Sequence, residues 1–252
     1  NNNNTIDFDC MYEVIPWPTL CYDIGCDPNV QGSMFYPRVF KSHLRMASIY
    51  RGCKYIVCVR EPLTTCLSFY NFMVNAKKVP SLQNMDISSF ARNTPFVKGN
   101  NETMRASLWE YYQEYHLLLD CPSVLIVVYE DLCRNTQTNI RRIANFMNIL
   151  PEREDDLIER VIHRSTKEYM KDHMSKFEEP CERAKILGRI GDITQLQPGD
   201  KVSFTSHEIQ MDEEGKQFLQ NQWNNTMLPL GYKDYDAFVS IILNKNQKRF
   251  GY

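Results

Sequence analysis

Residues 54–72 read KYIVCVREPLTTCLSFYNF, and the rest of the chain can be placed around them. They open with a short unbroken apolar run, residues 55–59, which predicts a strand covered on both faces in a parallel sheet. Arg60 ends the run. Glu61 and Pro62 follow it, a carboxylate and a fixed-φ residue that are typical of a helix's first turn. These residues therefore predict a strand, a sharp turn and a helix.

The turn of this unit is a candidate anion site. Open α/β sheets bind ligands at the carboxyl ends of their strands, and helix N-termini attract anions. We expect the Arg60 cation at that point, with the hydroxyl of Ser68, on the helix that follows, available to the same anion. A surface arginine and a solvated helix serine are the alternative interpretation.

The composition is that of a globular chain without a basic surface. The 252 residues suit one domain or two small ones, and a hydrophobic content of 43% supports a real core. The net charge is −2 and the sequence pI is about 6.3, so an anion site has to come from locally placed cations. This charge balance does not suggest nucleic-acid binding.

The nine cysteines are irregularly spaced and form no CxxC pair, which favours reduced thiols in a reducing compartment. We expect Cys58 and Cys66, which fall inside apolar patterns, to pack as small hydrophobic residues. Sequons at Asn3, Asn101 and Asn224 are weak signs of secretion in a chain rich in asparagine. No apolar run approaches the ~20 residues that span a bilayer, and the start lacks a signal-peptide pattern. We therefore expect a soluble, cytoplasmic chain without membrane contact.

A second candidate site follows residues 35–40, which we expect to form a strand that runs into Lys41, Ser42 and His43. Side chains two residues apart on a strand share a face, so the Lys41 ammonium and the His43 imidazole are predicted to point the same way. An imidazole titrates close to neutral pH and suits proton transfer. A structural histidine is the alternative interpretation.

The rest of the chain alternates strand and helix signals. Residues 124–128 are another continuous apolar run, ending at Tyr129, and predict a second central strand. Helical patterns occur at residues 87–91, 102–118, 140–150, 157–162, 211–227 and 235–243. Covered strands that alternate with helices predict an α/β fold, a parallel sheet flanked by helices. A basic segment, residues 183–189, is either a solvated surface or a lid over an anionic ligand.

In this order, these pieces resemble the cytosolic-type sulfotransferase family, which has a P-loop-kinase-like fold and uses the donor 3'-phosphoadenosine-5'-phosphosulfate (PAPS). The strongest element is REPLTTCLS, which matches the family's Arg-x-Pro followed by Ser and implies that Arg60 and Ser68 bind the donor's 3'-phosphate. The family's strand ending in Lys-Thr-His is similar to PRVFKSH, which implies that His43 is the base and that Lys41 assists the transfer.

The resemblance implies further donor contacts. The family's Tyr-Glu-Asp after a strand resembles VVYED, which places Tyr129 on the adenine side. Its Thr-Ser-Phe near the adenine corresponds to Ser165 and the two residues after it, where a lysine replaces the aromatic ring. Its Arg-Lys-Gly-x-x-Gly-Asp loop corresponds to the segment around Gly188, but the Arg-Lys pair is absent there, and Arg189 or Lys185 would have to substitute for it.

The family's opening strand and its Lys-Ser-Gly-Thr-Thr phosphate loop have no counterpart in this chain. We therefore expect residues 1–6 to be disordered or a scar of truncation, and residues 7–252 to be a single sulfotransferase-like α/β domain, incomplete at its N-terminus. Without that loop the chain as written is expected to show little or no sulfuryl transfer.

The implied function is transfer of a sulfuryl group from PAPS, a co-substrate, to a hydroxyl or amine of a small acceptor, with no metal. Trp17, Phe35 and Tyr36 weakly suggest an apolar or aromatic acceptor. Other interpretations are a non-catalytic nucleotide-binding or scaffold protein of the same fold, and a nucleotide kinase, for which no metal-holding carboxylates can be placed. The identity of the acceptor and the formation of a homodimer stay open.

Overall fold

The structure, a computed structural model, describes residues 11–21, 27, 29, 37–76, 79–98, 106–149, 154–173, 176 and 210–250. Residues 1–6 and the basic segment 183–189 lie outside these ranges. The described elements are, in order, α1 (Met11–Val14), α2 (Pro18–Cys21), a 3₁₀ turn (Met46–Ser48), β1 (Tyr55–Val59), α3 (Pro62–Tyr70), a π-helical turn (Asn71–Ala76), a 3₁₀ turn (Pro80–Leu82), α4 (Ile87–Asn93), α5 (Pro95–Lys98), α6 (Leu108–Leu117), β2 (Val124–Val128), α7 (Tyr129–Arg134), α8 (Thr136–Phe146), α9 (Glu154–Arg164), α10 (Lys167–Asp172), α13 (Glu213–Thr226), a 3₁₀ turn (Leu228–Leu230) and α14 (Tyr235–Phe250).

The two described strands form a parallel pair, as the sequence predicts. Tyr55 pairs with Val124 and Val59 pairs with Val128, so both strands end at the same level. Parallel strands cannot be joined by a hairpin, and the chain between them crosses over through α3, α4, α5 and α6.

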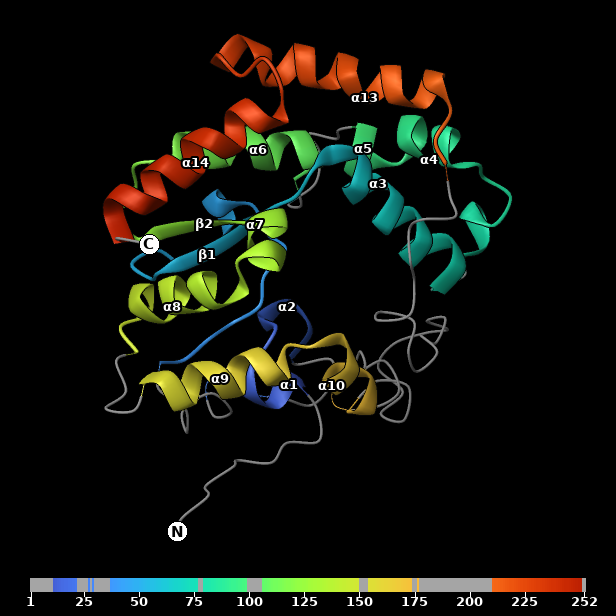
Figure 1. Cartoon of the computed structure of the whole chain (residues 1–252). Helices are drawn as coiled ribbons and strands as arrows, with labels where there is room; N and C mark the ends of the chain where they lie inside the picture. Colours follow the sequence, from blue (N-terminus) through green and yellow to red (C-terminus); the bar gives the residue numbers. More distant parts are fainter. Residues whose placement is uncertain are drawn as a thin grey trace.

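Helices cover both sides of this sheet (Figure 1). On one side α6 and α14 lie over the strands, and the main core there includes Trp109 and Phe238 of these helices. On the other side α8 packs against β2, where Phe146 contacts Leu125 and Val127. The layers of helix, sheet and helix confirm the predicted α/β class.

β1 is covered less than the sequence predicts. Val59 is fully buried, but Ile56 is 44% exposed and Cys58 is exposed as well. Both lie on the sheet face that carries Leu125, where the described helices cover β2 and leave β1 open. The expectation that Cys58 packs as a small core residue is therefore wrong, whereas Cys66 is fully buried as predicted. An apolar run specifies a strand but not the neighbours that cover it.

Helix α6 begins later than the predicted range 102–118 because a capping box starts it at Leu108. The Ser107 hydroxyl accepts the Glu110 N–H at 3.3 Å, and the Glu110 carboxylate accepts the Ser107 N–H at 2.7 Å. This reciprocal pair satisfies two of the donors that a helix start leaves open. The cap also fixes the position of Glu110 on the helix.

The predicted strand at residues 35–40 is wrong over its described part, residues 37–40, which form no strand. Pro37 has no N–H to donate to a neighbouring strand. The chain is held instead by individual hydrogen bonds, such as that from the Lys41 N–H to the Pro16 carbonyl at 2.9 Å.

The final predicted helix is longer than expected and runs to Phe250 as α14. None of the described helices combines the length and the apolarity of a membrane span.

Helices α13 and α4 meet at Gly215, which has no side chain. Asp212 caps α13, and its Oδ1 accepts hydrogen bonds from the Gly215 N–H at 2.8 Å and from the Ser88 Oγ at 2.6 Å. A Cβ atom on Gly215 would lie 2.5 Å from the Met211 Cγ and 2.6 Å from the Ser88 Oγ. Any side chain there would displace the bond between Ser88 and Asp212.

We expect Gly215→Ala to lower the free energy of unfolding by about 1–3 kcal/mol, because overpacking a well-filled contact usually costs that much. The better helix propensity of alanine, about 1 kcal/mol, offsets part of the loss. Urea unfolding followed by circular dichroism measures the change, with Asn225→Ala at an exposed position of α13 as the control. An unfolding free energy that is unchanged or raised in Gly215→Ala would contradict the tight contact.

Candidate functional site

Parallel pairing brings Arg60 and Tyr129 together. Val59 pairs with Val128, so the two residues that follow leave the carboxyl ends of adjacent strands at the same level. The guanidinium carbon of Arg60 lies 4.5 Å from the centre of the Tyr129 ring. Burial raises the pKa of Tyr129 above its ordinary value, although the Arg60 cation acts to lower it. A cation–π contact of this kind holds a cation without neutralising it.

The Arg60 guanidinium carries a donor that the described protein does not use. Its Nε is buried and has no hydrogen-bond partner, and none of the ion pairs found among the described residues involves Arg60. A buried donor without an acceptor typically costs about 1–3 kcal/mol. An anion bound at this point would supply the missing acceptor through a charge-assisted bond.

The main chain around Arg60 is held by side chains of α6 and α7, and a side chain of α14 supports the one from α7. Its carbonyl accepts a hydrogen bond from the Tyr112 hydroxyl of α6. On α7, one carboxylate oxygen of Glu130 accepts the Glu61 N–H at 2.9 Å, and the other accepts the hydroxyl of Tyr235, from α14, at 2.9 Å. These supports were missed by the sequence analysis. Only Glu130 carries a local signal, because it follows Tyr129 in VVYED.

The first turn of α3 is already capped. The Glu61 carboxylate accepts the N–H groups of Leu63 at 2.9 Å and Thr64 at 2.6 Å, and Pro62 has no N–H to offer. The expectation that this helix N-terminus attracts an anion is therefore wrong, because its donors are used and a carboxylate occupies the position. The candidate anion site depends on the side chain of Arg60.

The other predicted donor contacts are not brought to Arg60 by any described bond. Ser68 lies half-buried on α3, and its hydroxyl makes no hydrogen bond within the described residues. Ser165 is exposed between α9 and α10, where its hydroxyl donates to the Val161 carbonyl at 2.7 Å. Two further predicted positions lie outside the described residues, namely Gly188 and Arg189.

Trp17 brings Lys41 and His43 together without the predicted strand. The Lys41 Nζ lies 4.5 Å from the centre of the Trp17 ring system. The His43 ring centre lies 4.9 Å away from that of Trp17, with the ring planes at 73°. His43 is exposed, so its imidazole is accessible to a ligand. Within the described part of the chain, no group of three or more His, Cys, Asp or Glu side chains is arranged to hold a metal.

Helix α6 supports both candidate residues. The Tyr111 hydroxyl donates to the His43 carbonyl at 2.5 Å, and the hydroxyl of the next residue, Tyr112, donates to the Arg60 carbonyl. Two consecutive tyrosines on one helix thus hold the main chain of the candidate base and of the candidate anion-binding cation. The sequence marks α6 as rich in aromatic residues, but it does not indicate these long-range bonds.

Comparison with known proteins gives matches over most of the chain. The family model described as the sulfotransferase domain matches residues 6–227. Sulfotransferase 1A1 of Canis lupus familiaris is 31% identical over 147 residues, which are 56% of this chain and 47% of the relative. Sulfotransferase 6B1 of Mus musculus is 28% identical over 135 residues, which are 52% of this chain and 42% of the relative. The matched part thus spans about half the length of these curated relatives.

Solved structures share the fold. The mouse sulfotransferase SULT7A1, complexed with PAP, superposes with a TM-score of 0.57 at 15% identity, covering 81% of this chain and 69% of that one. Retinol dehydratase, complexed with androsterone and the inactive cofactor PAP, gives a TM-score of 0.51 at 18% identity, with 76% and 54% covered. The likeness in structure shows the α/β fold, and the family match covers well over half of the residues. The chain therefore belongs to the sulfotransferase family.

Proposed function

We propose that this chain provides the donor-binding and proton-accepting residues of a sulfotransferase that moves a sulfuryl group from PAPS to a hydroxyl or amine of a small acceptor. One observation carries the proposal: the Arg60 guanidinium lies against Tyr129 at the ends of two parallel strands, with a buried Nε that no described group accepts. A ligand that carries an anionic group beside an aromatic ring fits this arrangement. A 3'-phosphorylated adenosine has both, a phosphate for Arg60 and an adenine ring near Tyr129. The two solved structures of the same fold are complexes with PAP.

In this proposal Arg60 binds the 3'-phosphate and Ser68 adds a hydroxyl to the same group. The ring of Tyr129, which is 38% exposed, lies on the adenine side of the donor. Ser165 and the segment that contains Gly188 and Arg189 complete the nucleotide contacts. The 3'-phosphate distinguishes this donor from ATP, so Arg60 is the residue that selects it.

His43 is the proton acceptor in the proposed reaction. The acceptor's oxygen or nitrogen forms a bond to sulfur, its proton passes to the imidazole, and the bond from sulfur to the phosphate oxygen breaks. That oxygen keeps the electron pair. The Lys41 ammonium, which shares the Trp17 ring with His43, neutralises charge that develops on the transferred group and on the leaving oxygen.

The surroundings of His43 favour an acceptor with an apolar or aromatic surface. Trp17 packs directly against the imidazole, so a flat apolar molecule can contact the indole while its hydroxyl reaches the base.

The six described cysteines are all free, which supports a reducing, cytoplasmic location.

Retention on immobilised adenosine 3',5'-bisphosphate beside immobilised ATP, combined with transfer from labelled PAPS to a panel of phenols, alcohols and carbohydrates, tests the proposal. A sulfotransferase is retained by the bisphosphate and sulfates a member of the panel. Because the chain as written is expected to show little transfer, the transfer assay uses a form extended upstream to include a phosphate loop. In that form, retention without transfer would instead favour a nucleotide-binding scaffold, and preference for ATP would favour a kinase. Transfer only to a charged polysaccharide would contradict the small acceptor.

A further inference from the structure

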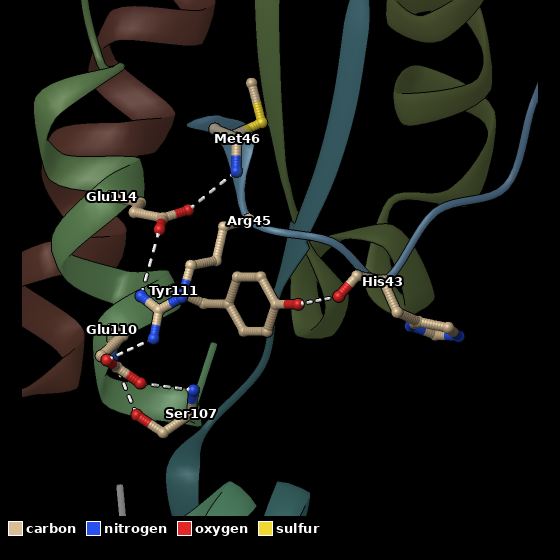
Figure 2. A network of polar contacts seen from close by, with 7 residues as sticks. All are labelled: His43, Arg45, Met46, Ser107, Glu110, Tyr111 and Glu114. Carbon is tan, nitrogen blue, oxygen red and sulfur yellow. Dashed lines mark hydrogen bonds and ion pairs between the residues drawn. The ribbon is translucent and has the colours of Figure 1, made fainter. Parts of the chain in front are cut away.

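The chain that follows the candidate base is fastened to α6 by main-chain bonds (Figure 2). At its start, the His43 carbonyl accepts the Tyr111 hydroxyl at 2.5 Å. At its end, the Met46 N–H donates to the Glu114 carboxylate at 3.2 Å. Both partners belong to α6, so the segment from His43 to Met46 is held at two points by one helix.

The side chain of Arg45 adds a third attachment between these points. Its guanidinium lies 2.5 Å from a Glu110 oxygen and 3.6 Å from a Glu114 oxygen. The side chains of Arg45, Glu110 and Glu114 are only 21%, 15% and 21% exposed, respectively. Water therefore screens this cluster less than it screens a surface pair. Figure 2 shows the guanidinium between the two carboxylates.

The ion pair shifts the pKa of each partner toward its charged form. The hydrogen bond that Arg45 donates to Glu110 is the largest influence that raises the pKa of Arg45. Burial acts to raise the pKa of Glu110, but the Arg45 guanidinium and the bonds from Ser107 outweigh it, and the pKa lies below its usual value. The capping box with Ser107 also fixes Glu110 at the start of α6. Arg45 is therefore anchored to a carboxylate that the cap of α6 holds in place.

None of these attachments uses the imidazole. Figure 2 shows the His43 ring directed away from the Arg45 cluster, while its carbonyl faces Tyr111. The centre of the His43 ring lies 4.9 Å from the centre of the Trp17 ring. A segment whose main chain is fixed while one titratable ring projects from it keeps that ring in a defined direction.

We propose that Arg45 and Tyr111 are positioning residues for His43, which hold the segment from His43 to Met46 on α6 and so fix the direction of the imidazole. The use of His43 as the base rests on the proposed function. The attachment itself does not, and it can be measured without turnover.

The first measurement is the NMR signal of the His43 ring in protein labelled at histidine ¹³Cε1, assigned by its loss in His43→Gln. In the parent protein we expect the Trp17 ring, whose centre lies 4.9 Å from that of His43, to displace this signal from that of an unstructured peptide. We expect Arg45→Met and Tyr111→Phe each to move it toward the peptide value. Arg45→Lys should restore part of the displacement, because a lysine keeps the charge but lacks the planar fork of donors.

Two residues that follow this segment in the sequence, Tyr50 and Arg51, serve as matched controls. Arg51→Met and Tyr50→Phe make the same chemical changes at exposed positions, and Tyr50 is 83% exposed. Neither should move the His43 signal. Thermal unfolding of every variant shows whether the domain stays folded. A His43 signal that is unchanged in both folded variants, Arg45→Met and Tyr111→Phe, would overturn the proposal.

The second measurement is turnover in an active preparation. Misplacing a reacting group by about 1 Å can cost up to about a hundredfold, so we expect kcat to fall between about tenfold and a hundredfold with the KM for the donor unchanged. A displaced His43 signal with unchanged kcat would support the positioning and contradict the base role of His43. The two measurements thus separate failure of this inference from failure of the proposed function.

Discussion

In an active preparation, His43→Ala is expected to reduce sulfuryl transfer by about 10²- to 10⁴-fold, the usual contribution of a positioned general base. Binding of the donor should be nearly unchanged, because the base acts on the acceptor and the candidate contacts to the donor's 3'-phosphate come from Arg60 and Ser68. The main-chain bond from the Tyr111 hydroxyl to the carbonyl of residue 43 does not depend on the imidazole, so the segment should stay in place. Initial rates with labelled PAPS and equilibrium binding of adenosine 3',5'-bisphosphate measure the two effects.

A second histidine provides the control for this experiment. His163 is exposed on α9 and has no role in the proposed reaction, so His163→Ala should keep the parent rate. His43→Gln, which preserves polarity but accepts no proton at neutral pH, should be as slow as His43→Ala. If donor binding fell as far as the rate, His43 would be structural and the base role would be refuted.

The sequence predicts the sheet and the position of Arg60 well, because both depend on local patterns. Two continuous apolar runs mark β1 and β2, and each is followed at once by a residue of the candidate site, Arg60 or Tyr129. Parallel pairing then decides that these two residues meet. The same local patterns place α4, α9 and α13 near their predicted ranges.

Features that depend on distant partners could not be predicted in this way. The apolar run of β1 does not predict the exposure of Ile56 and Cys58, because that exposure depends on which helices cover their face of the sheet. Pro37 and the absence of a described partner strand override the strand pattern before Lys41. The hydroxyl of Tyr112 reaches a carbonyl far away in the sequence, and no local pattern records such a bond.

Arg60→Ala is expected to weaken binding of adenosine 3',5'-bisphosphate by about 10- to 150-fold, because hydrogen bonds to a charged group contribute about 1.5–3 kcal/mol. Its 3'-hydroxyl analogue, adenosine 5'-phosphate, should lose much less, since Arg60 is assigned to the group that the analogue lacks. Isothermal titration of both nucleotides measures the difference. Arg60→Lys should fall between the parent and the alanine variant, because an ammonium keeps the charge but cannot form the planar double contact of a guanidinium.

The bonds that hold the loop after β1 make this prediction specific to the Arg60 side chain. The Tyr112 hydroxyl donates to the Arg60 carbonyl and Glu130 accepts the Glu61 N–H, so both bonds survive the substitution. The buried Nε also disappears in Arg60→Ala, so the free protein should lose little stability. Arg134→Ala, at an exposed position on α7, is the matched control and should bind both nucleotides as the parent does. Equal losses for the two nucleotides in Arg60→Ala would show that Arg60 supports the fold of the site and does not bind the 3'-phosphate.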